Sequence, residues 1–370
     1  MLQLAHSIPV QWRIAATVIA IQWGFLRDLI AENLFDSRFQ YYTEDDGRVD
    51  ILSSDSLFSY DLNDSLTLDG TLLYSAISGA SPTGLPPEKR GGNVPLATLD
   101  DERIAFTLSA TKKIAHHALK AGFSYSNESD YLSLGGSIQD TIELNEKNTE
   151  AVLGFAYTYD RVGAGGTDLD EAKRSYDWMV GVNQVLGPNT LLSANLTLAY
   201  KSGFLSDPYK YSLIDDEAWP EERPHKRFDQ LVNLQLTHYL EPLGASVELG
   251  YRFGHSDYGT ISHTASIALS KTIWNDRLLL RPSFRFYDQS AADFYAVDFS
   301  GDPQHFSSDY RLSGLQTFTF GLQVEWRVIP DRMNIHLGYE RYLMRGTDGQ
   351  TAPSAYPDAH AVTAGFSVRF

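Results

Sequence analysis

Alternation of apolar and polar residues runs through most of the chain after about residue 34 and limits the folds open to it. In "TFTFGLQVEWRV", apolar residues stand at the even positions from Phe318 to Val328, and polar or small residues stand at the odd positions between them. Successive side chains of a β-strand point to opposite faces, so this pattern predicts a strand whose two faces meet different solvents. The next segment, residues 333–340, repeats the pattern after the short turn "IPDR".

Sixteen segments show this alternation, centred near residues 38, 54, 71, 106, 120, 136, 154, 179, 195, 234, 250, 266, 283, 320, 338 and 364. The connections between them fall into two alternating classes. Even-numbered connections are short turns such as "LNDS", "LGPNT" and "WNDR", whereas every long connection, such as "SGFLSDPYKYSLIDDEAWPEERPHK", is odd-numbered. Short and long connections therefore lie at opposite ends of the strands, which is typical of bacterial outer-membrane barrels.

The composition favours a membrane barrel over a bundle of membrane helices. The chain has no uninterrupted apolar run of about 18 residues, its mean hydropathy is −0.26, and 12% of its residues are aromatic. Inside hydrocarbon every backbone polar group needs a partner, so a sheet must close on itself. We therefore predict an all-β fold: a transmembrane, up-and-down antiparallel β-barrel of about 16 strands, with short periplasmic turns and long extracellular loops. Tyr and Trp near the strand ends, among them Tyr342, are expected to form interfacial girdles.

Charge and residue content exclude several other classes of protein. A net charge of −17 argues against a nucleic-acid partner, and the absence of cysteine excludes disulfides and thiolate metal sites. Ser262 and His263 are adjacent in sequence and therefore point to opposite faces of a strand, so they do not form a catalytic pair. We expect neither an enzyme nor a bound cofactor, and no metal site is predicted with confidence from histidine spacing.

The first 33 residues lack the alternating pattern. An apolar stretch from Ile14 to Leu26 follows Arg13, as in the apolar region of a signal peptide, but no A-x-A cleavage site follows it. We interpret residues 1–33 as a degenerate signal peptide or an N-terminal helical segment, and residues 34–370 as the barrel.

Four stretches resemble an uncharacterised family of bacterial outer-membrane barrel proteins, classed only as a domain of unknown function. They are "YYTEDDGRVD" at 41–50, "LDGTLLYSAISGASP" at 68–82, "DDERIAFTLSATKKI" at 100–114 and "AGFSYSNESDYLSLGG" at 121–136. The most distinctive family-like residues are Asp69, Ser78, Gly79, Ala80, Ser81 and Pro82. The resemblance implies a fold and an outer-membrane location, and it implies no activity. The N-terminal segment departs from the family, whose members look as if they carry ordinary signal peptides.

The final stretch, "AVTAGFSVRF", is similar to the C-terminal signal that outer-membrane proteins present to the barrel-assembly machinery. Thr363 stands at the polar position and Gly365 follows it, while Val368 and Phe370 supply the closing apolar pair. We expect this strand to pair with the first strand and close the barrel. We also expect that deleting Phe370 impairs membrane insertion, which an insertion assay would measure.

Charged residues on the lumen face of the C-terminal half are the best candidate site. Alternation turns eight of them inward: Glu248, Arg252, Arg281, Arg285, Glu325, Arg327, His336 and Glu340. One interpretation is a charge ladder that screens ions or anionic solutes. The other is a network of mutually neutralising charges that stiffens the barrel, which the mixture of acids and bases favours.

One loop, "SLIDDEAWPEE", is rich in carboxylates: Asp215, Asp216, Glu217, Glu221 and Glu222. Oxygen-rich loops can hold Ca²⁺, which makes this loop a possible cation site, although the spacing matches no EF-hand. The alternative is a solvated acidic surface.

Two functions are consistent with these features. The first is a porin-like channel for small hydrophilic solutes, because a barrel of about sixteen strands usually leaves an aqueous lumen. The second is a non-conducting scaffold that anchors a periplasmic or surface partner, such as a lipoprotein or a redox protein. In both, we expect a bacterial outer-membrane location with membrane lipid and lipopolysaccharide as surroundings.

Overall fold

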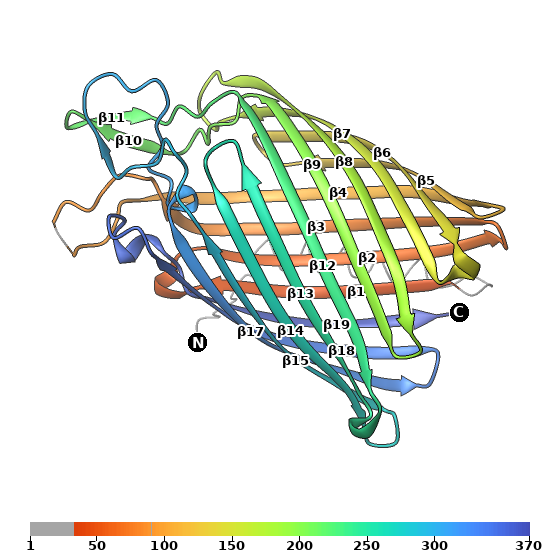
Figure 1. The fold of residues 1–370 in the computed structure, drawn as a ribbon. Coiled ribbons are helices and arrows are strands. Elements are labelled where there is room, and N and C mark those ends of the chain that lie inside the picture. The colour runs from red at the N-terminus through yellow and green to blue at the C-terminus, as the bar shows by residue number, and fades with distance from the viewer. Residues whose placement is uncertain (1–32, 90) are drawn as a thin grey trace, which may run out of the picture.

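A computed structural model describes residues 33–89 and 91–370, and within them sixteen strands form one closed antiparallel barrel (Figure 1). The barrel strands are β1 (Leu34–Glu44), β2 (Asp50–Asn63), β3 (Leu66–Pro82), β4 (Leu96–Ile114), β5 (His117–Asn127), β6 (Tyr131–Leu144), β7 (Thr149–Gly163), β8 (Asp170–Gly187), β9 (Thr190–Gly203), β12 (Lys226–Leu240), β13 (Ala245–Ser256), β14 (Ile261–Ile273), β15 (Leu278–Gln289), β17 (Leu315–Ile329), β18 (Met333–Gly346) and β19 (Ala359–Arg369). Each of the sixteen predicted centres lies inside one of these strands. The fold prediction is confirmed. The predicted signal segment lies outside the described residues, apart from Asn33.

The barrel closes where β19 pairs with β1, from Leu34 opposite Arg369 to Glu44 opposite Ala359. Next to this pair, the backbone N–H of Asn33 donates to the carbonyl of Phe370 at 2.7 Å. Closure leaves no unpaired edge among the sixteen barrel strands, which is the condition for a sheet in hydrocarbon. The expected pairing of the last strand with the first is therefore confirmed.

The two faces of the wall differ as the alternation predicts. Leu249, Ile267 and Phe320 are exposed on the outer face, while their sequence neighbours Ser266 and Thr319 line the interior. Aromatic rings pack across neighbouring strands on the outer face, as Phe284 and Phe320 do with ring centroids 5.1 Å apart. The assignment of Tyr342 to an outer girdle is wrong, because this residue lies opposite Thr319 and shares its inner face.

The two ends of the barrel are built differently. At the end that carries the short connections, which we call the turn end, two of the connections contain a short 3-10 helix. The 3-10 helices are η2 (Asp45–Gly47), η3 (Asn145–Lys147), η4 (Glu241–Leu243), η5 (Tyr310–Leu312) and η6 (Pro353–Ala355). Of these, η3 and η4 lie at the turn end. No helix in the described part of the chain is long and apolar enough to cross a membrane.

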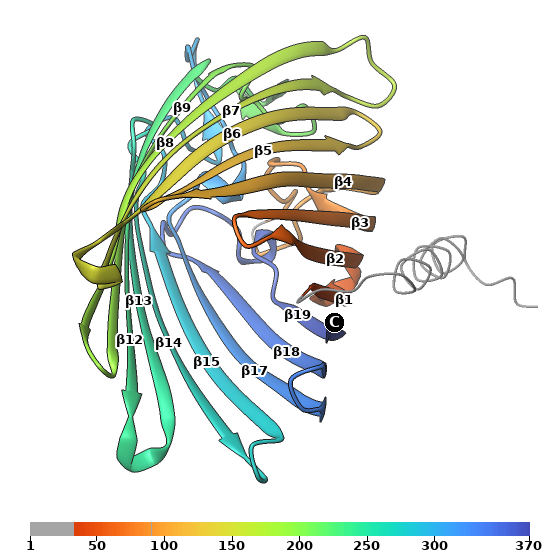
Figure 2. The ribbon, with the colours of Figure 1, turned by 90° about the vertical axis from the view of Figure 1, so that its right-hand side faces the viewer.

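At the opposite end, the loop end, long connections fold together into a structure that we call the cap, formed by residues 83–89, 91–95, 204–225, 290–314 and 347–358. The cap contains a three-stranded sheet of β10 (Tyr211–Ile214), β11 (Glu217–Pro220) and β16 (Asp298–Phe299). Tyr258, Ala292 and Leu312 form a small hydrophobic core beside it. Seen from the turn end, the strands form a ring with the cap segments behind it (Figure 2).

Candidate functional site

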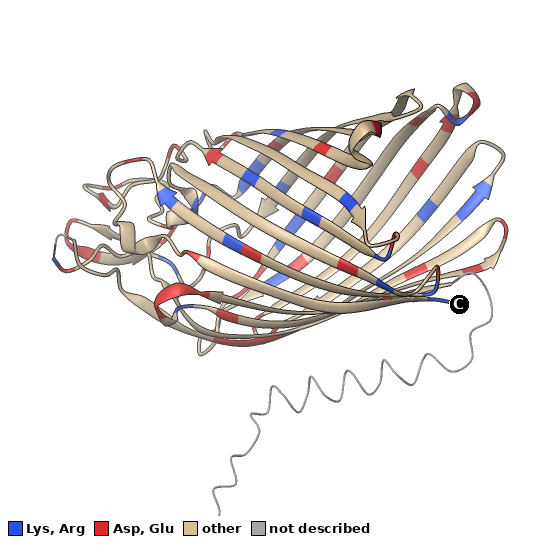
Figure 3. Ribbon diagram, turned by 90° about the horizontal axis from the view of Figure 1, so that it is seen from below, with Lys and Arg blue, Asp and Glu red and all other residues tan. Residues whose placement is uncertain are grey.

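The eight predicted lumen charges lie on four strands of one sector of the inner wall. Glu248 and Arg252 lie on β13, Arg281 and Arg285 on β15, Glu325 and Arg327 on β17, and His336 and Glu340 on β18. These strands are neighbours in the barrel, with β14 between β13 and β15. Figure 3 shows acidic and basic residues interspersed along the barrel strands. The structure therefore brings these residues together, and their role in selectivity stays a prediction.

Part of this sector surrounds a hollow of about 380 Å³ in the inner wall, which we call the arginine recess. The floor of the recess is formed by small residues of β13, β14 and β15, namely Gly250, Ser266 and Ser283. Longer side chains surround them. The charged members are Glu248, Arg252, Arg281, Arg285 and Glu340, and the neutral polar members include Asn195, Asn233, Gln235, Thr264 and Thr319.

A second hollow of about 470 Å³, the histidine recess, extends from β15 across the closure of the barrel to β1 and β2. His336 Nδ1 lies 3.5 Å from Glu325 Oε2, and His336 Nε2 lies 3.6 Å from Asp36 Oδ2. Asp36 also pairs with Arg38, at 2.8 Å between Oδ1 and Nε. The ion pair of Asp36 and Arg38 joins opposite charges beside this recess, which agrees with the second interpretation of the charge ladder.

Asp36 and Arg38 are members of this network that the sequence pattern did not assign to it. In the sequence they only interrupt the apolar alternation of the first strand. They approach His336 because β1 and β18 flank β19 in the closed barrel. Their membership could have been predicted from the sequence, because both residues lie on the inward face of the first strand, which was expected to close the barrel against the last.

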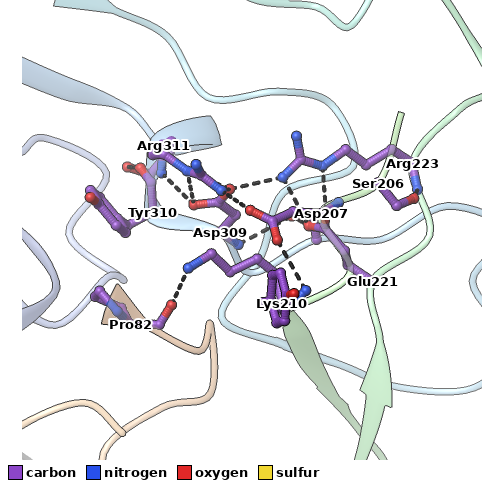
Figure 4. Close-up of polar contacts among 12 residues, drawn as sticks. Pro82, Ser206, Asp207, Lys210, Glu221, Arg223, Asp309, Tyr310 and Arg311 are labelled. Atoms are coloured by element: carbon purple, nitrogen blue, oxygen red, sulfur yellow. Dashed lines mark hydrogen bonds and ion pairs between the residues drawn. The ribbon is translucent and has the colours of Figure 1, made fainter. Parts of the chain in front are cut away.

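A second group of charges ties the cap together, shown in Figure 4. Asp309 is the centre of this group, and its side chain is only 1% exposed. Arg223 Nη2 donates to Asp309 Oδ2 at 2.8 Å, and Arg311 Nε donates to Asp309 Oδ1 at 2.9 Å. Burial by itself raises the pKa of Asp309, but the charges of Arg311 and Arg223 and the hydrogen bond from Arg311 outweigh it and hold the pKa at about 2.

Glu221 and Lys210 extend this network in two directions. Glu221 is fully buried and lies 2.7 Å from Arg223, between its Oε1 and the arginine Nε. Burial raises the pKa of Glu221, partly offset by Arg223. Lys210 donates to Ser81 Oγ at 3.1 Å and to the carbonyl of Pro82. The network therefore connects the two longest loops to the loop end of β3.

The family-like residues belong to two separate places. Ser78, Gly79, Ala80, Ser81 and Pro82 form the loop end of β3. Gly79 has a φ of 120°, and a Cβ atom there would lie 1.9 Å from the carbonyl oxygen of Arg48. Asp69 lies farther down β3, where it accepts from Ser59 at 2.8 Å and pairs with Lys120 at 3.4 Å. The loop end of β3 therefore contacts the cap through Ser81 and Pro82, and Asp69 lies apart from it.

The five carboxylates proposed as a loop cation site are not brought together, which corrects that prediction. Asp215 and Asp216 lie at the tip of the β10–β11 hairpin, where Asp215 accepts from the backbone of Gly301 at 3.1 Å. Glu221 is turned into the cap beside Arg223, and Glu222 pairs with His225 at 3.1 Å. The fifth residue, Glu217, begins β11 and is exposed. Asp215 and Asp216 therefore lie at one end of the β10–β11 hairpin, and Glu221 and Glu222 lie at the other end. Among the described residues, the carboxylates near enough to share an ion are instead Asp101, Glu128 and Asp130.

The residues of the predicted assembly signal lie in and just after β19. Thr363 faces the interior and accepts from Gln40 Nε2 at 3.2 Å. A Cβ atom on Gly365 would lie 2.5 Å from the carbonyl oxygen of Ser37, so this position in the closing pair requires glycine. Val368 and Phe370 have the opposite parity and lie on the outer side. Recognition by the assembly machinery stays a prediction.

Solved structures similar to this chain are outer-membrane barrels. CdiB from Acinetobacter baumannii is 9% identical with a TM-score of 0.50, and the match covers 93% of this chain and 61% of CdiB. The siderophore receptor PirA from Pseudomonas aeruginosa is 11% identical with a TM-score of 0.46, over 92% of this chain and 62% of PirA. The outer membrane protein OpdK from P. aeruginosa is 10% identical with a TM-score of 0.45, over 91% and 98%.

The chain spans about three-fifths of the length of CdiB and PirA. At these identities the similarity to CdiB shows the fold alone. No curated protein matches the sequence. One family description, "Protein of unknown function (DUF3570)", matches residues 22–171 and 166–370. This match confirms the resemblance found in the sequence, and the chain belongs to the DUF3570 family.

Proposed function

We propose that this protein is an outer-membrane channel for small hydrophilic solutes. The observation that carries the proposal is the polar inner wall, with recesses of about 380 and 470 Å³ lined by charged, amide and hydroxyl side chains. An interior built of large apolar side chains would instead form a packed, dry core. Barrels of about sixteen strands leave room for water inside.

The outer surface supports an outer-membrane location for the channel. Leucine, isoleucine, valine and phenylalanine side chains are exposed on strands all around the barrel, among them Leu108, Ile138, Val180 and Leu337. Such a surface is unfavourable in water and favourable against lipid. We orient the barrel with its turn end toward the periplasm, so that the cap faces lipopolysaccharide and the cell surface.

The cap favours passage of small solutes over large ones. It is folded around a hydrophobic core and a buried charge network rather than being a set of separate loops. A folded cap at the loop end narrows the route into the lumen. We therefore expect selection by size at the cap and by charge at the recesses.

Liposome swelling tests the channel directly. Purified protein in liposomes should let arabinose enter faster than protein-free liposomes do, and the rate should fall steeply for a tetrasaccharide such as stachyose. Denatured protein taken through the same procedure is the control for leakage. Swelling no faster than in protein-free liposomes would contradict the channel.

A second candidate, the scaffold, is favoured by one surface feature. On the hairpin of β10 and β11, Trp219 is 50% exposed, and Tyr211 and the adjoining Tyr209 are also exposed. Exposed aromatic side chains of this kind are common at the centres of protein interfaces. Absence of swelling, together with a specific surface partner that Trp219→Ala loses, would favour the scaffold.

A further inference from the structure

Two arginines in the arginine recess have hydrogen-bond donors to spare. Arg281 is paired, with its Nη2 2.8 Å from Glu248 Oε2. Arg252 makes no side-chain hydrogen bond or ion pair with any described residue. Arg285 makes one long hydrogen bond, 3.5 Å to Thr319 Oγ1. A guanidinium group carries five N–H donors, so most of the donors of these two residues have no protein acceptor.

The register of the strands directs both arginines to the same hollow. Arg252 on β13 lies opposite Thr264, and Arg285 on β15 lies opposite Ser266. Thr264 and Ser266 are successive inward residues of β14, which separates the two arginine strands. Because β14 carries only short side chains there, it leaves open space between the guanidinium groups.

The other lining residues define what kind of anion fits this space. Three arginines face two glutamates, so the recess carries one net positive charge within a chain of net charge −17. Glu340, which has no cationic partner among the described residues, disfavours a second negative charge on a ligand. The side-chain amides of Asn195, Asn233 and Gln235 also line the recess and can form hydrogen bonds with hydroxyl groups.

We propose that the arginine recess binds a small organic acid that carries one carboxylate and several hydroxyl groups. Arg252 and Arg285 hold the carboxylate, since the planar guanidinium group matches carboxylate geometry. The three amides and the Glu340 carboxylate form hydrogen bonds with the hydroxyl groups of the acid. This inference rests on the proposed channel only in naming the acid as a solute; the binding site itself does not require conduction.

Calorimetric titration of the purified protein in detergent with gluconate tests the site at low ionic strength. Gluconate carries one carboxylate and five hydroxyl groups, whereas sorbitol has the same chain length and no charge. We expect saturable binding of gluconate and none of sorbitol. Arg252→Gln combined with Arg285→Gln should weaken gluconate binding about tenfold or more, because charge-assisted hydrogen bonds are lost.

Arg38→Gln is the matched control, because Arg38 lies on the inner wall outside the arginine recess and already pairs with Asp36. It should leave gluconate affinity unchanged. Gel migration of unheated samples verifies that each variant has folded. Equal affinity of the double variant and the wild type, or equal binding of sorbitol, would overturn the site. Swelling without gluconate binding would refute the site alone, whereas gluconate binding without swelling would refute the channel alone.

Discussion

Asp309→Asn is expected to loosen the cap and to leave the barrel intact. The substitution keeps the shape of the side chain and removes its charge, so Arg223 and Arg311 lose the carboxylate that both contact. Removing one partner of a buried ion pair costs about 3–5 kcal/mol. Amide hydrogen exchange in residues 290–314 should therefore become about 100-fold faster or more, while exchange in the β12–β15 strands stays unchanged.

Asp302→Asn is the control for this substitution, because Asp302 is exposed on the same loop and its side chain makes no hydrogen bond or ion pair with a described residue. Acid should reproduce the effect of Asp309→Asn. The pKa of Asp309 is lowered from 3.8 to about 2, so its stabilising contribution is present above pH 3.8 and is lost as the pH falls through 2. The difference in exchange between wild type and variant should shrink steadily as the pH falls from about 4 through 2. A difference as large at pH 2 as at pH 5 would contradict the assignment.

Gly79→Ala is expected to have the second large effect, on the stability of the whole barrel. The new Cβ atom would lie 1.9 Å from the carbonyl oxygen of Arg48, and the φ of 120° is unfavourable for any side chain. Either the loop end of β3 moves or the backbone is strained. We expect the free energy of unfolding, measured by urea titration in lipid vesicles, to fall by about 2–4 kcal/mol.

Gly166→Ala separates the two causes of that loss. Gly166 also has a positive φ, of 77°, but no atom lies within 4 Å of the position its Cβ would occupy. Gly166→Ala should lower the free energy of unfolding only by the cost of backbone strain, about 1–2 kcal/mol. Equal losses at Gly79 and Gly166 would show that the contact with Arg48 has no energetic role.

The strands and the faces of the wall were predictable from the sequence because each depends on local alternation. Each strand has lipid on one face and water on the other, so the pattern around Glu325 and Trp326 predicts that the first faces the lumen and the second faces lipid. A short turn then fixes the register between the two strands that it joins. Parity and strand order together place Arg252 and Arg285 in one sector of the inner wall.

The cap and the pairing of charges were not predictable in this way. The sequence places Glu221 in a loop expected to bind a cation or to face solvent, yet it is buried, because it pairs with Arg223 and accepts a hydrogen bond from Ser307, 86 residues away. The sheet of β10, β11 and β16 joins two loops that share no periodic pattern. Asp36 meets His336 only through closure of the barrel. Contacts between distant segments leave no local trace in a single sequence.

If water and small solutes cross the barrel, ions cross it too, and single-channel recording in a planar lipid bilayer measures their passage as a current. We expect addition of purified protein to produce discrete current steps of uniform size, each step marking the insertion of one conducting unit. Asp309→Asn should also give discrete steps, because the barrel wall does not depend on the cap. A bilayer that stays silent, while inserted barrel is recovered from it in its folded form, would contradict the proposed channel.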